Sequence, residues 1–542
     1  GSWSTVVRRV VAGVIATLVV TTIWVTPTSA ASGIGSGQRL ATAAVFGYEV
    51  PSGGFRSIDG SDLFMCALST GSEIYCWGDN TFSGIEQGAS DGANTGDAPG
   101  EIAATPPINL GTDARVHQFD VGNSSACAVI DNGGVKCWGQ NTSGKLGYGD
   151  TSIRYNPAQM GDSLATVGLG INVTAIKVGV GAEHACVITN SRNVKCWGGN
   201  SFGQVGRGDI NSWGDGASEM GPSLPNVNIG SGVLARDIHV GSHHACVRTN
   251  TGSVKCWGRN DYGQLGIGSM DNIGDGTGEM GSSLASVSLP NGTVLALYGG
   301  AYTTCVRLST GSYCWGLGNH GIRFDGDYDN VGDGPSEMGV SLTAMSLGTY
   351  EDVLDYSSPI SNAFAHACVI ISSGRVKCAG QNSNGQLGRG TTTNFGLTSS
   401  EIGVNLAAID FGIEDYAIDI AVAEHHSCAL LINGEIDVAI MVSNALSEPQ
   451  AMVCETLTRS RNRVWLPSNH ELATQDEVSL SDCAACNLIV LEADRIDELM
   501  NGQGDLAHVR LRPVEIKDVL RREPVQLDDT AIRVLVEGRT VM

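Results

Sequence analysis

The chain has 542 residues, of which 73 are glycine, 6% are aromatic and 16% are charged, and its formal net charge is −24. A sequence with so few charged residues is not a solvated, disordered chain. The acidic balance argues against nucleic acid as a partner, because phosphate binding needs clustered Lys and Arg. Frequent glycines and few aromatics favour an all-β chain with many short strands and turns.

The first thirty residues have the order of a secretory signal. Two arginines precede an apolar run over residues 10–25, and small residues follow it. We therefore expect residues 1–31 to be a signal peptide, with residues 32–45 as a lead-in. The alternative is an uncleaved leader, which would be the chain's membrane attachment, although the run is shorter than the roughly 20 residues of a membrane span. Both alternatives predict a secreted, extracellular or cell-surface protein.

A cysteine pair recurs about every 60 residues along residues 46–436, a period typical of a repeat architecture. In six copies the second cysteine follows nine or ten residues after the first, with a turn signal such as Thr251-Gly252 between them. This pattern predicts a β-hairpin whose facing cysteines are close enough to bond. Ordered pairs of this kind favour an oxidising compartment. The expected disulfides are Cys66–Cys76, Cys127–Cys137, Cys186–Cys196, Cys246–Cys256, Cys305–Cys314 and Cys368–Cys378.

A tryptophan follows the second cysteine in five copies. Neighbouring residues on a strand point to opposite faces, so the disulfide and the indole lie on opposite sides of a strand that is buried on both. The sixth copy has Ala379 at this position, which predicts a weaker contact there. An Asn-x-x-Gly turn comes next, and both residue types tolerate the positive φ of a tight turn. The structural tryptophans are Trp77, Trp138, Trp197, Trp257 and Trp315.

A histidine stands two residues before the first cysteine in four copies. Because it recurs at one repeat position, we expect it to make a shared structural hydrogen bond. Zinc is the alternative, but a zinc site would need free thiols at a closer spacing. These structural histidines are His184, His244, His366 and His426.

A second motif, Gly-Asp…Glu-Met-Gly, recurs in the spacers between hairpins. Its two carboxylates are weak calcium candidates, because calcium prefers oxygen ligands but one such pair supplies too few of them. The favoured interpretation is that Asp caps a local turn and Glu accepts backbone N–H groups. The pairs are Asp215 and Glu219, Asp275 and Glu279, and Asp333 and Glu337. No catalytic set such as Ser-His-Asp stands out, and the sequence predicts no cofactor.

The whole pattern, H-x-C…G-x-V-x-C-W-G-x-N-x-x-G-Q-L-G-x-G, resembles the repeat of the regulator of chromosome condensation family. The resemblance covers residues 46–434 and implies a seven-bladed β-propeller of four-stranded blades. It also implies that strands from both chain ends close the ring within one blade. Nuclear members of that family are GTPase exchange factors, from which this chain departs by its leader, its paired cysteines and its acidity. Secreted bacterial relatives include propeller inhibitors of β-lactamase, which bind a partner protein on one face.

The seventh copy departs from the pattern after Cys428. Asp437-Val438-Ala439-Ile440 stands where Lys-Cys-Trp-Gly is expected. We therefore place the propeller at residues 46–436 and a divergent segment of α+β character at residues 437–542, either a separate small domain or misjoined sequence. In this segment Cys483 and Cys486 are candidates for a local disulfide, because the redox and zinc alternatives lack a βαβ context and a second pair.

These features favour a non-catalytic, monomeric scaffold that binds a protein or another extracellular macromolecule through loops on one face. Propeller repeats form a rigid body, and function resides in the loops. The first alternative is a lyase or hydrolase with its site at the central channel, which would need titratable side chains converging from several blades. The second is a regulator similar to a GTPase exchange factor, which would need free thiols.

Overall fold

The computed structural model describes residues 54–62, 64–79, 95, 105–359, 366–411 and 416–432, together with the backbone of residues 436–439, 489–490 and 512–513. These residues belong to one compact unit, Gly35–Met542. The expected leader and the Cys483–Cys486 pair lie outside the described residues. Within them, helices are too short and polar to cross a membrane.

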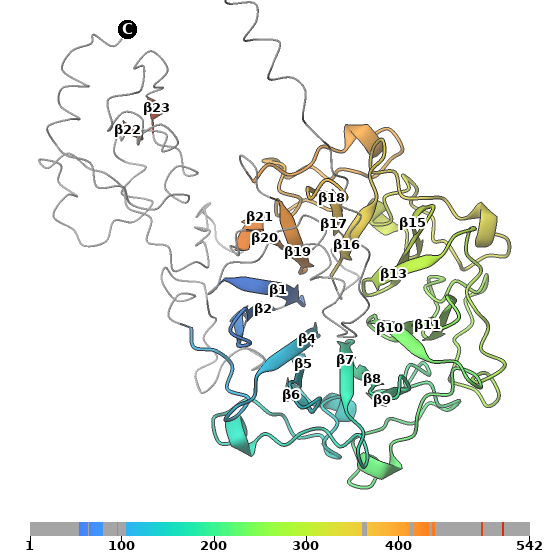
Figure 1. Ribbon diagram of the computed structural model, residues 1–542. Coiled ribbons are helices and arrows are strands. Elements are labelled where there is room, and N and C mark those ends of the chain that lie inside the picture. Colours follow the sequence, from blue (N-terminus) through green and yellow to red (C-terminus); the bar gives the residue numbers. More distant parts are fainter. Residues whose placement is uncertain are drawn as a thin grey trace, which may run out of the picture. The chain divides into compact units, whose positions relative to one another are not determined.

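Seven antiparallel sheets of three strands follow one another along the chain, and each is one blade (Figure 1). The inner strands are β1 (Phe55–Gly60), β4 (Val116–Gly122), β7 (Ala175–Val180), β10 (Ala235–Val240), β13 (Val294–Gly299), β16 (Val353–Ser357) and β19 (Ala417–Val422). The middle strands are β2 (Phe64–Ser69), β5 (Ser125–Ile130), β8 (His184–Thr189), β11 (His244–Thr249), β14 (Thr303–Leu308), β17 (His366–Ile371) and β20 (Ser427–Leu431). The outer strands are β3 (Ile74–Gly78), β6 (Val135–Gly139), β9 (Val194–Gly198), β12 (Val254–Gly258), β15 (Gly311–Gly316), β18 (Val376–Gly380) and β21 (Ile436–Ala439).

Short elements complete the described chain. Six 3-10 turns lie in the loops: η1 (Thr142–Gly144), η2 (Gly161–Ser163), η3 (Gly221–Ser223), η4 (Asn319–Gly321), η5 (Gly339–Ser341) and η6 (Gly403–Asn405). A separate antiparallel pair consists of β22 (Ile489–Val490) and β23 (Arg512–Pro513).

In six blades the fourth strand is reduced to a bridge of one residue pair. In blade four, Gly258 at the end of β12 pairs with Ile273, and five other blades have the equivalent bridge. Gly258 has a φ of 106°, a backbone conformation that favours glycine and turns the chain away from the strand direction. These six blades therefore have three strands and a bridge, where the resemblance implied four full strands.

Inner strands of successive blades pack against one another, and β19 of blade seven packs against β1 of blade one. The Ile58 N–H donates to Asp419 Oδ2 over 2.9 Å, between residues 361 positions apart. Ile58 also shares a core cluster with Ala421 and Leu430. The chain thus closes into a seven-bladed β-propeller. Among the described strands each blade is continuous in sequence, and the described contacts that close the ring are those between β19 and β1.

The six cysteine pairs expected from their spacing are disulfides in the structure. Each one joins a middle strand to an outer strand, as the register of Cys246 opposite Cys256 illustrates. In blade seven the register places Val438 opposite Cys428, at the position where the other blades carry their second cysteine. The cross-links stabilise blades whose apolar cores are distributed over several interblade clusters.

Candidate functional site

The repeated tryptophans connect neighbouring blades. The indole N–H groups of Trp197, Trp257 and Trp315 each donate over 3.0 Å to a backbone carbonyl in the turn of the preceding blade. The rings are buried, and a Cβ on Gly206 of the preceding turn would lie 2.9 Å from Trp257 Nε1. The tryptophan and the turn glycine therefore form one interlocking contact. Trp138 is likewise buried, and Trp77 packs in the cluster that closes the ring.

Blade six keeps this interface filled although it lacks the tryptophan. The preceding turn, in blade five, has Phe324 at the position that Gly266 occupies in blade four. Phe324 keeps the positive φ of that glycine, 57° compared with 65°. Phe324 and Ala379 are fully buried in one cluster. The weaker contact expected at Ala379 is therefore corrected, because an aromatic ring from the neighbouring blade supplies the missing volume.

The spacer carboxylates have structural partners. One oxygen of Glu219 accepts the N–H groups of Gly214 and Gly216 over 2.8 Å, and Glu279 and Glu337 repeat this arrangement. Burial, followed by the neighbouring Glu219 carboxylate, raises the pKa of Asp215. Burial and the Glu337 carboxylate raise the pKa of Asp333 in the same way. Among the described residues, no group of three or more His, Cys, Asp or Glu side chains has a metal-binding arrangement. The glutamates thus act as acceptors for their own loops.

The repeated histidines reach toward the next blade. His244 Nε2 lies 3.1 Å from Thr304 Oγ1, and His366 Nε2 lies 2.9 Å from Ser427 Oγ. Each hydroxyl donates its hydrogen to the backbone carbonyl of a glutamine, Gln264 or Gln386. The hydroxyl oxygen therefore accepts from the histidine, and the histidine Nε2 carries the proton. At the position equivalent to Thr304, the blade after His184 carries Ala245. His184 accordingly has no hydrogen bond to either ring nitrogen, and burial lowers its pKa to about 3.

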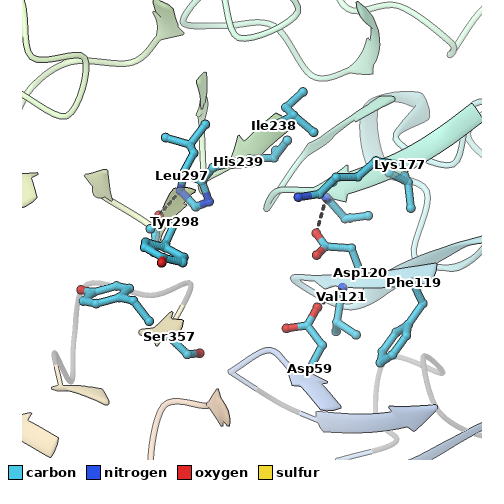
Figure 2. A pocket seen from close by; sticks show the side chains of 18 of the residues that line it. Asp59, Phe119, Asp120, Val121, Lys177, Ile238, His239, Leu297, Tyr298 and Ser357 are labelled. Atoms are coloured by element: carbon cyan, nitrogen blue, oxygen red, sulfur yellow. Dashed lines mark hydrogen bonds between the residues drawn. The ribbon is translucent and has the colours of Figure 1, made fainter. Parts of the chain in front are cut away.

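The central channel is a small polar cavity of about 140 Å³ between the inner strands. Figure 2 shows Asp59, Asp120 and Lys177 on one side of it and His239 and Tyr298 on the other. Asp59 Oδ2 accepts the Val121 N–H over 2.9 Å, and Asp120 Oδ2 accepts the Val180 N–H over 2.6 Å. In both cases the carboxylate binds the inner strand of the following blade.

The same type of contact continues around the channel. Lys177 pairs with Asp237 at 2.6 Å, and His239 Nε2 lies 3.3 Å from the Gly300 carbonyl. Tyr298, Ser357 and Asp419 make the remaining contacts to the backbone of the next inner strand. Burial lowers the pKa of His239 to about 4, so its imidazole is neutral at pH 7. These channel groups therefore hold the inner strands together, and we call them the channel belt.

One end of every blade gathers two loops. The loop between inner and middle strands meets the loop that follows the outer strand, as shown by the 2.9 Å hydrogen bond from the Arg259 N–H to the His243 carbonyl. Blades three and five have the equivalent bonds. Because Gly258 and Ile273 pair again, residues 259–272 stay at this end. We call the surface that these loops form the turn face.

An aromatic cluster lies on the turn face of blades three to five. It consists of Phe202, His243, Arg259, Tyr262 and Tyr302. The Phe202 and His243 rings meet edge to face at 5.3 Å, as do the Tyr262 and Tyr302 rings. The Arg259 guanidinium joins the two pairs, at 4.8 Å from the Phe202 ring and 5.5 Å from the Tyr302 ring. All of these side chains except buried Tyr302 are partly exposed.

Three exposed apolar residues occupy one repeat position on the same face. Ile210 is 61% exposed, Met270 is 62% exposed and Tyr328 is 46% exposed. We call them the rim residues. The equivalent positions in blades two and six hold Thr151 and Thr392. Among the described residues, apolar side chains at this repeat position thus occur in three adjacent blades, and blade two exposes Ile153 two residues further along the equivalent loop, at 44%.

The loops that carry the rim residues are fixed by internal hydrogen bonds. Asn200 Nδ2 donates to the Asp209 carbonyl, and Asn260 Nδ2 donates to the Ser269 carbonyl, each over 2.6 Å. Blade five has Gly318 in place of this asparagine, and the buried Arg323 guanidinium binds the loop carbonyl of Asp329 instead. The aromatic cluster and the rim residues were not predicted from the sequence. A comparison of equivalent positions between copies is the signal that finds them.

The fold and the repeated interblade contacts define the class of this protein as a seven-bladed β-propeller. The profile of the "Regulator of chromosome condensation (RCC1) repeat" matches residues 175–204 and 235–264. The chain is 25% identical over 336 residues to the Ultraviolet-B receptor UVR8 of Arabidopsis thaliana, across 62% of this chain and 67% of the receptor. It is 25% identical over 268 residues to the human E3 ubiquitin-protein ligase HERC2, across 48% of this chain but only 5% of the ligase.

Two solved structures share the fold. Human WBSCR16 aligns with a TM-score of 0.52 at 18% identity, over 71% of this chain and 89% of that one. Prp20p from Saccharomyces cerevisiae aligns with a TM-score of 0.50 at 15% identity, over 71% of this chain and 82% of that one. At these identities the likeness concerns the fold alone.

A second profile, the LysR substrate binding domain, matches residues 415–519. This range begins ahead of the boundary that we placed at residue 437, and it includes β19, β20 and β21. In the structure these three strands form blade seven. The likeness and the strands therefore give different starting points for the C-terminal segment, and the boundary at residue 437 stays a prediction.

Proposed function

We propose that this protein is a non-catalytic, monomeric scaffold that binds another protein through the turn face of blades three to five. The rim residues are the observation that carries the proposal. Blades two and six show that the scaffold accepts threonine at this position, so the exposed apolar side chains of blades three to five have no evident structural purpose. Exposed apolar patches mark interaction sites, and the rim residues share one face on three adjacent blades.

The aromatic cluster supports the same face. Tyrosine and arginine are enriched among the residues that dominate binding energy, and Arg259, Tyr262 and Phe202 lie on loops that also carry rim residues. The asparagine contacts hold the loops in one conformation before binding, which lowers the entropy lost on association.

The alternative of an enzyme has less support. A lyase or hydrolase at the channel would need titratable groups available to a substrate, whereas Asp59, Asp120 and Lys177 are engaged in the channel belt. A regulator similar to a GTPase exchange factor would work in a reducing compartment, where six disulfides are not expected to persist. The disulfides instead support a secreted or cell-surface location.

A photo-crosslinking experiment tests the proposal. The full chain would carry a photoreactive amino acid at Met270 or, as the control, at Val340, an exposed apolar residue that lies outside the turn-face loops. In extracellular medium we expect a discrete protein adduct from position 270 and none from position 340. The substitutions Ile210→Thr and Tyr328→Thr should abolish that adduct, whereas Val404→Thr should leave it unchanged. Equal labelling from both positions would show that the turn face is not the binding surface.

A further inference from the structure

Acidic side chains surround the rim residues. Asp209 directly precedes Ile210, and Asp271 directly follows Met270. Tyr328 lies between Asp327 and Asp329, and Asp271, Asp327 and Asp329 are all exposed. We call these aspartates the acidic rim. Each rim residue therefore has at least one carboxylate next to it in the sequence.

The cations of the same loops are already paired. Arg259 pairs with Asp261 at 2.6 Å and stacks on Phe202, and Arg207 lies 4.0 Å from Asp209 and stacks on Trp213. Asp271, Asp327 and Asp329 have no such cation partner among the described ion pairs. The charges next to Met270 and Tyr328 that have no ion-pair partner among the described residues are therefore carboxylates, in keeping with the net charge of −24.

From this arrangement we propose that the partner of the turn face presents a basic protein surface in which apolar side chains lie among lysines and arginines. The inference rests on the proposed function and specifies its partner. Apolar anchors of the partner would cover the rim residues, while its cations would meet the acidic rim. Complementary charge also accelerates encounter.

A second copy of this chain is a poorer occupant of the same surface. A two-fold contact places the same patch on both partners. Such a contact through the turn face would bring the acidic rims of two copies together, and like charges in contact oppose association. Charge therefore favours a different, basic protein.

Synthetic peptides of defined chemistry test the inference in the full chain. Fluorescence anisotropy would compare labelled 15-residue peptides of alternating Lys and Leu, alternating Glu and Leu, and alternating Lys and Ser. The proteins are the wild type, a rim variant (I210T/M270T/Y328T), a charge variant (D271N/D327N/D329N) and a control variant (V340T/V404T). The asparagines keep the acceptor oxygen that Asp327 uses toward the Asp329 N–H.

We expect the Lys–Leu peptide to bind the wild type and the control variant most tightly. The charge variant should weaken that binding by roughly tenfold and remove most of its salt dependence. Equal Kd values for the wild type and the charge variant would overturn the basic partner. If the charge variant has no effect but the rim variant still weakens binding of the Glu–Leu peptide, the proposed function stands and only the basic character of the partner is overturned. An unchanged Kd for every peptide with the rim variant would overturn both, and a dimer of the wild type that the rim variant abolishes would identify a second copy as the occupant.

Discussion

The side chains that recur along the repeats make their important contacts one blade away. Trp257 contacts a turn of the preceding blade, and His244 contacts a hydroxyl of the following blade. Asp59 binds a backbone N–H of the next inner strand. Recurrence in the sequence shows that these residues matter, but it does not show their partners, because each partner lies 53 to 62 positions away.

Acid is expected to destabilise the propeller through its buried histidines. Burial lowers the pKa of His184 to about 3 and that of His239 and His426 to about 4, compared with 6.5 for an unperturbed imidazole. The unfolded chain therefore binds more protons below pH 6.5. Stability is fully present above that pH and falls as the pH drops, by about 1.4 kcal/mol per pH unit for each histidine. Denaturant midpoints between pH 7.5 and pH 5 measure this slope.

The variant His184→Thr provides the control, since Thr303 occupies the same repeat position in blade five. It removes one of the buried imidazoles and should make the slope shallower. A slope identical to that of the wild type would show that His184 does not contribute to the acid sensitivity.

A hydroxyl opposite His184 should stabilise the protein. In the variant Ala245→Ser the new Oγ would occupy the position of Thr304 Oγ1 and Ser427 Oγ, where it could accept a hydrogen bond from His184 Nε2. We expect the free energy of unfolding to rise by about 1 kcal/mol, the typical net value of a buried hydrogen bond. Chemical denaturation at pH 7.5 measures the change. Ala185→Ser serves as the control, because the preceding blade has Ser125 and not histidine at the donor position.

At the scale of elements, each hairpin is a local structure, whereas each blade–blade interface is shared between two copies. The hairpins and their disulfides follow from residues nine or ten positions apart. The interface between blades five and six depends on Phe324 and Ala379, which lie in different copies. The effect of a substitution at an interface therefore depends on the residues of the neighbouring copy.

Exchanging the aromatic ring between these two blades tests this relation. Phe324→Gly alone leaves a cavity and should cost about 3–5 kcal/mol, and Ala379→Trp alone overpacks the interface and should cost about 1–3 kcal/mol. The double variant recreates the arrangement of Gly266 and Trp315 and should recover most of the loss. A double-mutant cycle by guanidinium unfolding measures the coupling. Additive costs would mean that Phe324 does not occupy the space of the missing indole.

At the scale of the whole molecule, the ring is closed where β19 packs against β1. The contact of Asp419 with the Ile58 N–H is at the same repeat position as the contact of Gln118 with the Val178 N–H. It differs in that the blades it joins are at opposite ends of the repeat array. Closure is thus a repetition of the ordinary blade–blade contact between distant parts of the chain.

The variant Asp419→Ala should weaken closure selectively. It leaves the buried Ile58 N–H without its acceptor, at a cost of about 1–3 kcal/mol. We expect amide hydrogen exchange to accelerate in β1 and β19, and mass spectrometry of peptic fragments measures it. The matched variant Asp59→Ala should accelerate exchange in β4 and leave β19 protected. Unchanged exchange in β1 for Asp419→Ala would contradict a role of this contact in closing the ring.

The separation of contacting residues along the sequence decides how much of the candidate site was predictable. The sequence predicted the cysteine pairs, the buried tryptophans and the backbone-binding role of Glu219, because these features recur at fixed positions within each copy. The filled interface at Ala379 was not predictable, since Phe324 stands one repeat earlier. The aromatic cluster was also missed, because Phe202, Arg259 and Tyr302 come from three different copies.

The sequence by itself determined the hairpins, their cross-links and the number of blades, since these depend on interactions within one repeat and on the period between repeats. Only the tertiary structure decided that the channel aspartates bind neighbouring strands and that Ile210, Met270 and Tyr328 lie at the same end of adjacent blades. The physical reason is that ring packing joins side chains from successive repeats, and a linear pattern does not contain that adjacency.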